Sequence, residues 1–265
     1  MRSRTAKPAV ALTLLVMALL GAAIAHAETE SQILGNVEMT TSASLSPKKL
    51  PRKGRAPIAV SLGWKVATTD GTTPPTLKNL RIEINRNGIL DPTGLPVCPY
   101  AKIQPASTER ALKNCRSSLV GKGSFAALVG IEGQESYITK GKMVVFNSEM
   151  GGKPVLFGQI YSAYPFANSF VIVFKVSKEK KGEYGTILNA TLPASLRSWG
   201  NLTEINMRLS RKYGYQGQQR SFLSANCPTP KGVPTTSFKL ARTSFAFIGG
   251  PKLGSTLTDS CVVRH

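Results

Sequence analysis

The feature that most restricts the fold of this chain is a repeated alternation of apolar and polar residues. In one stretch the apolar side chains are Ile58, Val60, Leu62, Trp64 and Val66, and the residues between them are small or polar. Successive side chains of a strand point to opposite faces, so this period of two predicts a strand with one buried face.

Further strands are expected at short spacing along the chain. Leu80, Ile82 and Ile84 alternate before Asn87-Gly88, a pair typical of hairpin turns. The other strand candidates are residues 119–129, 142–147, 155–164, 169–176, 184–191, 203–209, 221–225, 238–248 and 253–263. One short helix is expected at 107–115, where Ser107 or Thr108 can cap it. The pattern predicts a mainly β protein, an antiparallel β-sandwich of ten or more strands over residues 57–265; two smaller packed sandwiches are the alternative.

Residues 1–27 have the features of a secretory signal peptide. Arg2, Arg4 and Lys7 precede an apolar run, and the small residues Ala25 and Ala27 form a cleavage site. An uncleaved membrane anchor is the alternative, although the run is short for a bilayer span. No later segment is continuous and apolar enough to cross a membrane. We therefore expect a secreted protein, or one held at the cell envelope by non-covalent contacts.

The predicted mature chain is strongly basic. The full chain has a net charge of +20, and removing residues 1–27 takes away three cations and no acid, which leaves +17. Nucleic acid is a common partner of basic chains, but export argues against it here. Anionic envelope polymers or phospholipid head groups are the expected partners, and a merely solvated basic surface is the alternative.

Four cysteines remain after removal of the signal peptide, namely Cys98, Cys115, Cys227 and Cys261. An even number in an exported chain predicts disulfides. Three pairings are possible, and the pairing of sequence neighbours, Cys98–Cys115 with Cys227–Cys261, closes the shortest loops. A four-thiolate zinc site would need closely spaced cysteine pairs, which the chain lacks.

The predicted mature core contains no histidine, because His26 leaves with the signal peptide and His265 is the last residue. This excludes Ser–His–acid and Cys–His catalysis and His-ligated metal sites. A calcium-like loop begins at Glu83 but has Gly94 where the twelfth position needs an acid. We expect no metal and no cofactor.

Carboxylate chemistry is the remaining route to catalysis. Glu132/Glu135 and Glu179/Glu183 are close acidic pairs, and residues so near in sequence rarely face each other across a cleft, as a glycosidase requires. We therefore expect a protein that is not an enzyme, with a carboxylate-dependent hydrolase as the least favoured alternative.

Residues 28–56 are expected to form an extended, solvated, basic connector rich in Pro and Lys. The cations are densest in a five-cation cluster, Lys48, Lys49, Arg52, Lys53 and Arg55. The alternative to a solvated connector is an arm that binds polyanions through this cluster.

Three aromatic residues are candidate sugar contacts. Trp199 lies in an expected polar loop, and Tyr213 and Tyr215 flank a glycine in an expected hairpin tip. Tyrosines two residues apart point to one side of a strand and could stack on sugar rings. Aromatic packing over the hairpin is the alternative.

Several motifs resemble a known group of proteins. They are Ser46-Pro47-Lys48-Lys49-Leu50-Pro51, Gly94-Leu95-Pro96-Val97-Cys98-Pro99, Cys115 with Leu119-Val120-Gly121-Lys122-Gly123, Arg220-Ser221-Phe222-Leu223-Ser224-Ala225-Asn226-Cys227-Pro228, and the late Cys261. Together they resemble an uncharacterised family of exported proteins of high-GC Gram-positive bacteria, over most of residues 40–265. The resemblance implies export and disulfides, and no activity.

The function expected from the sequence is that of an exported, extracellular or envelope-associated structural or binding protein that contacts anionic envelope polymers. A carbohydrate-binding module that contacts polysaccharide is the alternative. Oligomeric state and ligand identity do not follow from the sequence.

Overall fold

A computed structural model describes residues 28–130, 133, 135–164 and 166–264 of the chain. The expected signal peptide lies outside the described residues. Within them, no helix is long and apolar enough to cross a membrane.

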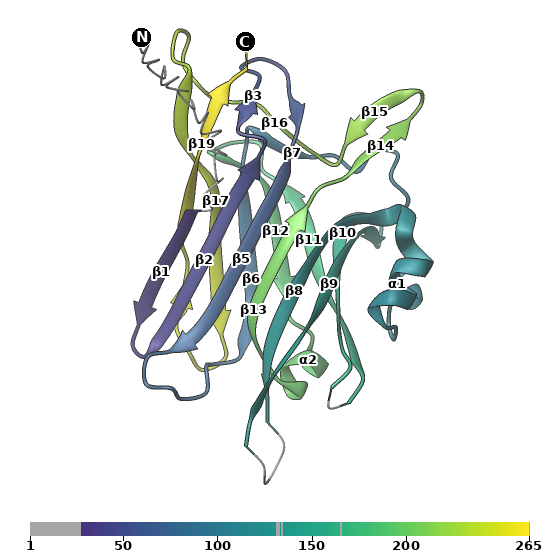
Figure 1. Ribbon diagram of the computed structural model, residues 1–265, viewed down its shortest axis with the longest axis vertical. Coiled ribbons are helices and arrows are strands. Elements are labelled where there is room, and N and C mark those ends of the chain that lie inside the picture. The colour runs from purple at the N-terminus through teal and green to yellow at the C-terminus, as the bar shows by residue number, and fades with distance from the viewer. Residues whose placement is uncertain (1–27, 131–132, 134, 165, 265) are drawn as a thin grey trace, which may run out of the picture.

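One large sheet of 14 strands forms most of the molecule and curls strongly into a half-barrel (Figure 1). In spatial order its strands are β1 (Glu28–Leu34), β2 (Val37–Ser46), β5 (Ala59–Thr68), β13 (Asn201–Leu209), β8 (Leu119–Val129), β9 (Tyr137–Met150), β10 (Lys153–Ser162), β11 (Asn168–Lys178), β12 (Tyr184–Thr191), β6 (Leu77–Asn85), β17 (Thr235–Phe247), β19 (Thr256–Val263) and β3 (Lys49–Leu50), with β18 (Lys252–Leu253) beside β17. All pairs are antiparallel except β19 with β3. The mainly β prediction is confirmed, and each expected strand overlaps an observed one.

Two small sheets and two short helices complete the fold. The small sheets are β4 (Ala56–Pro57), β16 (Leu223–Ala225) and β7 (Gly88–Leu90), and the hairpin of β14 (Lys212–Tyr215) with β15 (Gln218–Ser221). The helices are α1 (Thr108–Cys115) and α2 (Ala194–Trp199), with single 3-10 turns η1 (Tyr100–Lys102) and η2 (Arg116–Ser118). Helix α1 confirms the expected helix, and the Ser107 side chain caps it by accepting from Arg110 N.

The expected sandwich is replaced by this single curled sheet, whose first and last strands approach each other. Leu45 N of β2 donates to Asp259 Oδ2 of β19 at 2.9 Å, and the hydroxyls of Thr41 and Ser255 lie 2.5 Å apart. Alternation shows that a strand has one buried face, but not whether that face meets a second sheet or the same sheet curled round. The inner face encloses the main core, where Trp64 of β5 packs edge-on against Phe245 of β17.

A second core lies on the outer face, the face turned away from the main core. Residues 98–115, which include η1 and α1, cover part of β9, β10 and β11 there, with Ile103 and Ala111 fully buried against Phe146 and Phe157. As a result, residues 143–148 and 155–160 are buried on both faces of the sheet.

Both expected disulfides are present. Cys98–Cys115, with a Cα–Cα distance of 5.5 Å, holds the ends of the outer cover together. Cys227–Cys261, at 5.7 Å, ties the segment after β16 to β19 inside the main core.

Most of the N-terminal segment is not the extended, solvated connector that the sequence predicts. Residues 28–50 form β1, β2 and β3 within the large sheet, and alternate residues of β2 are buried. The alternation that would predict β2 is weak in the sequence, because the inward-pointing Thr41 and Ala43 are polar or small.

Candidate functional site

Trp199 is not an exposed loop residue. It ends helix α2, a helix that the sequence pattern does not predict, and its side chain is half-buried against Phe170 with ring centroids 5.2 Å apart. Pro193 precedes this helix at its N-cap and Gly200 follows it, so the proline and glycine at its ends were the available signal. Trp199 therefore packs on the core and offers little free ring surface.

Tyr213 and Tyr215 lie on the β14–β15 hairpin, as the sequence predicts, and both are engaged. The buried Tyr213 hydroxyl donates to the carbonyl oxygens of Asp91, at 3.2 Å, and Thr93, at 2.7 Å. Burial, helped by the charge of Asp91, raises the pKa of Tyr213. The Tyr215 ring lies so close over Gly94 that a Cβ at that position would be 2.3 Å from the ring. The two side chains thus fasten the hairpin to residues 91–94.

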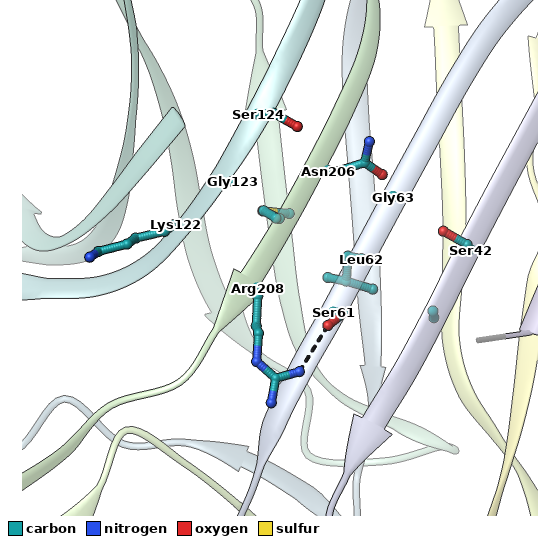
Figure 2. Close-up of a pocket in the computed structure, with 11 residues that line it drawn as sticks. Ser42, Ser61, Leu62, Gly63, Lys122, Gly123, Ser124, Asn206 and Arg208 are labelled. Atoms are coloured by element: carbon teal, nitrogen blue, oxygen red, sulfur yellow. Dashed lines mark hydrogen bonds between the residues drawn. The ribbon is translucent and has the colours of Figure 1, made fainter. Parts of the chain in front are cut away.

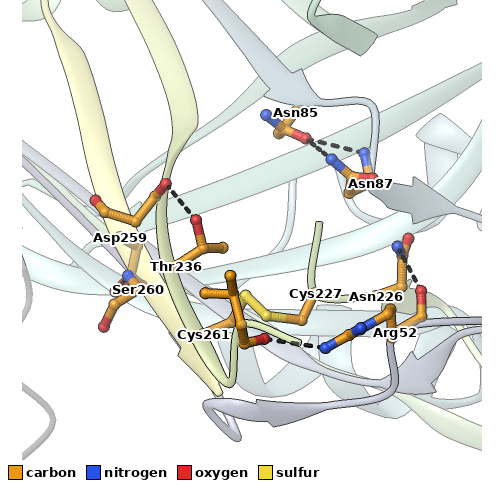
Figure 3. The surroundings of a disulfide bond; sticks show 11 residues. Arg52, Asn85, Asn87, Asn226, Cys227, Thr236, Asp259, Ser260 and Cys261 are labelled. Atoms are coloured by element: carbon orange, nitrogen blue, oxygen red, sulfur yellow. Dashed lines mark hydrogen bonds between the residues drawn. A yellow bond between two sulfur atoms is a disulfide. The ribbon is translucent and has the colours of Figure 1, made fainter. Parts of the chain in front are cut away.

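The five-cation cluster divides into structural and free members. Lys48 forms an ion pair with Asp259, and Arg52 Nη2 donates to Val233 O at 3.0 Å. Figure 3 shows Arg52 beside the Cys227–Cys261 disulfide. Neighbouring backbone contacts join the same segments, because Cys227 N donates to Pro51 O at 2.9 Å.

The other three members of the cluster, Lys49, Lys53 and Arg55, are exposed. Lys49 lies on strand β3, and Lys53 and Arg55 lie between β3 and β4, so the structure leaves three exposed cations here rather than five on a solvated arm.

A shallow groove crosses the outer face of β2, β5, β13 and β8 (Figure 2). Its floor is a row of directly opposed residues on these four strands, in the order Ser42, Gly63, Asn206 and Ser124. Position 63 has no room for a side chain between its two neighbours in the row. A Cβ at Gly63 would lie 2.4 Å from Asn206 Oδ1 and 2.7 Å from Ser42 Oγ. The hollow has a volume of about 240 Å³.

The neighbouring row carries the charge. Ser61, Arg208 and Lys122 are directly opposed on β5, β13 and β8, and Arg208 Nη1 donates to Ser61 Oγ at 3.1 Å. Lys122 and Arg208 also line a second hollow of about 220 Å³ that extends the groove to Arg211. We call these two hollows together the outer-face groove.

Among the described residues, no carboxylate forms an ion pair with Lys122, Arg208 or Arg211. The buried Arg211 Nε also lacks a hydrogen-bond partner there. Directly opposed like charges destabilise a sheet, and an unpaired buried donor costs about 1–3 kcal/mol. An anion bound between Lys122 and Arg208 would relieve the first of these costs.

The basic face continues beyond the groove onto β9. Lys142 lies opposite Ser124, and Lys140 lies two residues before it on the same face. The sequence gives no sign of this surface, because its residues come from strands that are distant along the chain.

Acidic residues do not form a comparable site. Glu83 is buried on the outer face, where Arg242 and Arg81 bind its carboxylate, the latter at 3.1 Å. The hydrogen bond from Arg242 is the main reason that the pKa of Glu83 is lowered. Of the close acidic pairs, Glu183 accepts from Lys239 at 3.1 Å, and Glu132 lies outside the described residues.

No cluster of three or more His, Cys, Asp or Glu side chains suited to a metal ion occurs in the described part of the chain. Comparison with protein-family models, curated proteins and solved structures finds no match. The resemblance to an uncharacterised family of exported proteins of high-GC Gram-positive bacteria therefore stays a prediction.

Proposed function

We propose that this protein is an exported, envelope-associated binding protein whose outer-face groove holds an anionic polymer. The observation that carries the proposal is the direct opposition of Lys122 and Arg208 beside Arg211, with no described carboxylate in ion-pairing reach. The groove is open at the surface and crosses several strands, which suits a chain molecule better than a small enclosed ligand.

Location outside the cytoplasm is supported by two observations. The two disulfides are typical of oxidising compartments, and residues 1–27 have the composition of a secretory signal. A large positive charge would retain such a protein on anionic envelope polymers.

The alternative of a carbohydrate-binding module built on Trp199, Tyr213 and Tyr215 has less support. Their side chains are half-buried or buried against Phe170 and residues 91–94, so no row of free ring faces is present at these positions.

The test is binding of the purified, disulfide-bonded protein to a polyphosphate chain and to an uncharged polysaccharide. Exposed charges attract over about 8 Å at physiological salt but only about 3 Å at 1 M, so polyphosphate affinity should fall steeply as salt is raised. The double variant Lys122→Gln/Arg208→Gln should bind polyphosphate about tenfold more weakly, equivalent to about 1.4 kcal/mol.

The matched control is Lys180→Gln/Lys181→Gln, which removes the same charge from an exposed turn between β11 and β12. Equal loss of affinity in both double variants would show that net charge alone governs binding and would contradict the groove. Salt-independent binding of the uncharged polysaccharide would favour the carbohydrate-binding alternative.

A further inference from the structure

Exposed apolar side chains gather at one end of the molecule. Of the ten large hydrophobic side chains that are exposed among the described residues, six lie where strands of the curled sheet turn at this end, and we call them the apolar end: Ile33, Leu34, Ile138, Tyr164, Phe166 and Ile248. Antiparallel pairing places them at the same end of the sheet, because β1, β8, β10 and β17 end there and β2, β9 and β11 begin there. In Figure 1 this is the lower end.

The most exposed members belong to two neighbouring hairpins. Ile138 on β9 is 64 % exposed, and Tyr164 and Phe166 between β10 and β11 are 71 % and 69 % exposed. The Tyr137 and Tyr164 rings meet edge to face with centroids 5.9 Å apart, which joins the two hairpins. Such a group of free aromatic and aliphatic side chains marks an interaction surface rather than scattered exposure.

This surface is held in place by the buried structure behind it. The hydroxyls of Thr139 and Ser162 are buried and lie 2.7 Å apart. Ser162 Oγ donates to Tyr164 O at 2.8 Å, and Thr139 Oγ1 lies 3.2 Å from the same carbonyl. The backbone of Tyr164 is therefore fixed while its ring faces outward, so docking costs little ordering of the chain.

Two lysines follow the exposed apolar residue of strand β9 at regular spacing. Ile138, Lys140 and Lys142 are exposed and lie on one face of β9, since they are two residues apart. A strand rises about 3.3 Å per residue, which places the two lysines about 7 and 13 Å behind Ile138. With these distances, Ile138 can lie at the boundary of the acyl chains of a bilayer while the two lysines lie among its head groups. The connection between β8 and β9 also carries two acids, Glu132 and Glu135, of which only Glu135 is among the described residues.

We propose that the apolar end docks on the surface of an anionic phospholipid bilayer, with Ile138, Tyr164 and Phe166 entering the interface and Lys140 and Lys142 binding phosphate head groups. Tyrosine and phenylalanine suit this boundary because their rings are apolar and the tyrosine hydroxyl can stay in water. A second copy of the chain is a poorer occupant, because the lysines of two apolar ends would face each other. Lys142 lies opposite Ser124 of the outer-face groove, but Ile138, Tyr164 and Phe166 do not line that groove, so the proposal does not depend on polyanion binding there.

The test is flotation of the disulfide-bonded protein with vesicles of phosphatidylglycerol and phosphatidylcholine, and with vesicles of phosphatidylcholine alone. The wild type should float with the anionic vesicles. The variant Ile138→Ser/Tyr164→Ser/Phe166→Ser should lose at least tenfold in apparent affinity for them while keeping its polyphosphate binding.

The matched control replaces three other exposed apolar residues away from this end, Val97→Ser/Met150→Ser/Val233→Ser, and should float as the wild type does. All six positions are exposed, so thermal unfolding of both variants should remain close to that of the wild type. Phe166→Trp supplies a direct readout, since its fluorescence should be quenched by brominated acyl chains.

Several results would overturn the proposal. One is equal flotation of the apolar-end variant and the wild type, and another is absence of quenching at position 166. Loss of flotation in Lys122→Gln/Arg208→Gln but not in the apolar-end variant would assign vesicle binding to the groove instead. Binding of an uncharged polysaccharide, rather than vesicles, through Tyr164 and Phe166 would make the surface a sugar platform.

Discussion

Lys122 and Arg208 lie directly opposite each other on β8 and β13, two cations at a position where a sheet favours opposite charges. Each such cross-strand pair contributes about 0.2–1 kcal/mol, with the sign set by the charges. If stability alone determined this pair, one of the two positions would carry an acidic or a neutral residue. The pair therefore connects the stability of the sheet with the proposed function of the groove.

The first prediction follows from this opposition. Lys122→Glu replaces repulsion by attraction, so the free energy of unfolding at low ionic strength should rise by about 0.2–1 kcal/mol, while polyphosphate binding weakens. Urea unfolding at low and high salt measures the first effect, and the gain should shrink as salt screens the pair. Lys231→Glu, at an exposed turn, is the control for net charge and should change the free energy of unfolding by less. A destabilised Lys122→Glu protein would show that the two side chains do not interact as their positions indicate.

The second prediction separates the two kinds of cation in the five-cation cluster. Lys48→Ser removes the ion-pair partner of Asp259, whose side chain is only 6 % exposed, so the free energy of unfolding should fall by about 1–3 kcal/mol. Lys53→Ser removes an exposed charge and should change it by less than about 0.5 kcal/mol. Chemical denaturation of the two single variants makes the comparison. Equal stability of the two would mean that the Lys48–Asp259 contact contributes nothing to the junction of β2 and β19.

The sequence predicts those parts of the fold whose signals are local. Trp64 and its alternating neighbours identify β5, Ser107 marks the start of α1, and the pairing of sequence neighbours gives both disulfides. Each of these depends on residues close together in the chain, where periodicity, capping and loop length act directly.

The remaining features depend on contacts between distant segments. The outer-face groove joins Ser42, Gly63, Lys122 and Arg208, which lie on four strands whose order in the sheet differs from their order in the chain. The curl of the sheet depends on how β2 meets β19, more than 200 residues later. The structural use of Lys48 likewise depends on a partner near the C-terminus, so charge density alone led to the expectation of a solvated arm.

The third prediction concerns pH. The hydrogen bond from Arg242 holds the pKa of Glu83 below its ordinary value of 4.5, with burial acting in the opposite direction and Arg81 reinforcing the effect. A carboxylate with a lowered pKa in the folded protein contributes stability above its ordinary pKa, and this stability is lost as the pH falls through the lower, folded value. The free energy of unfolding should therefore decrease below about pH 4.5, and less steeply in Glu83→Gln than in the wild type. Glu149→Gln, at an exposed position near the end of β9, is the control and should follow the wild type; an unchanged slope in Glu83→Gln would contradict the prediction.

The last prediction compares the two disulfides. The loop between Cys227 and Cys261 spans 34 residues and that between Cys98 and Cys115 spans 17, so loop entropy makes the first bridge more stabilising by about 0.6 kcal/mol. Their positions add to this difference, because Cys227–Cys261 lies in the main core and ties β19 to the segment after β16, whereas Cys98–Cys115 closes only the outer cover. We expect Cys227→Ala/Cys261→Ala to lower the free energy of unfolding of the whole molecule more than Cys98→Ala/Cys115→Ala does. In the second variant, amide exchange should quicken in α1 and residues 98–106 while β5 and β6 stay protected. Greater global destabilisation from losing Cys98–Cys115 would mean that the outer cover, and not the closure of the curled sheet, limits the stability of the fold.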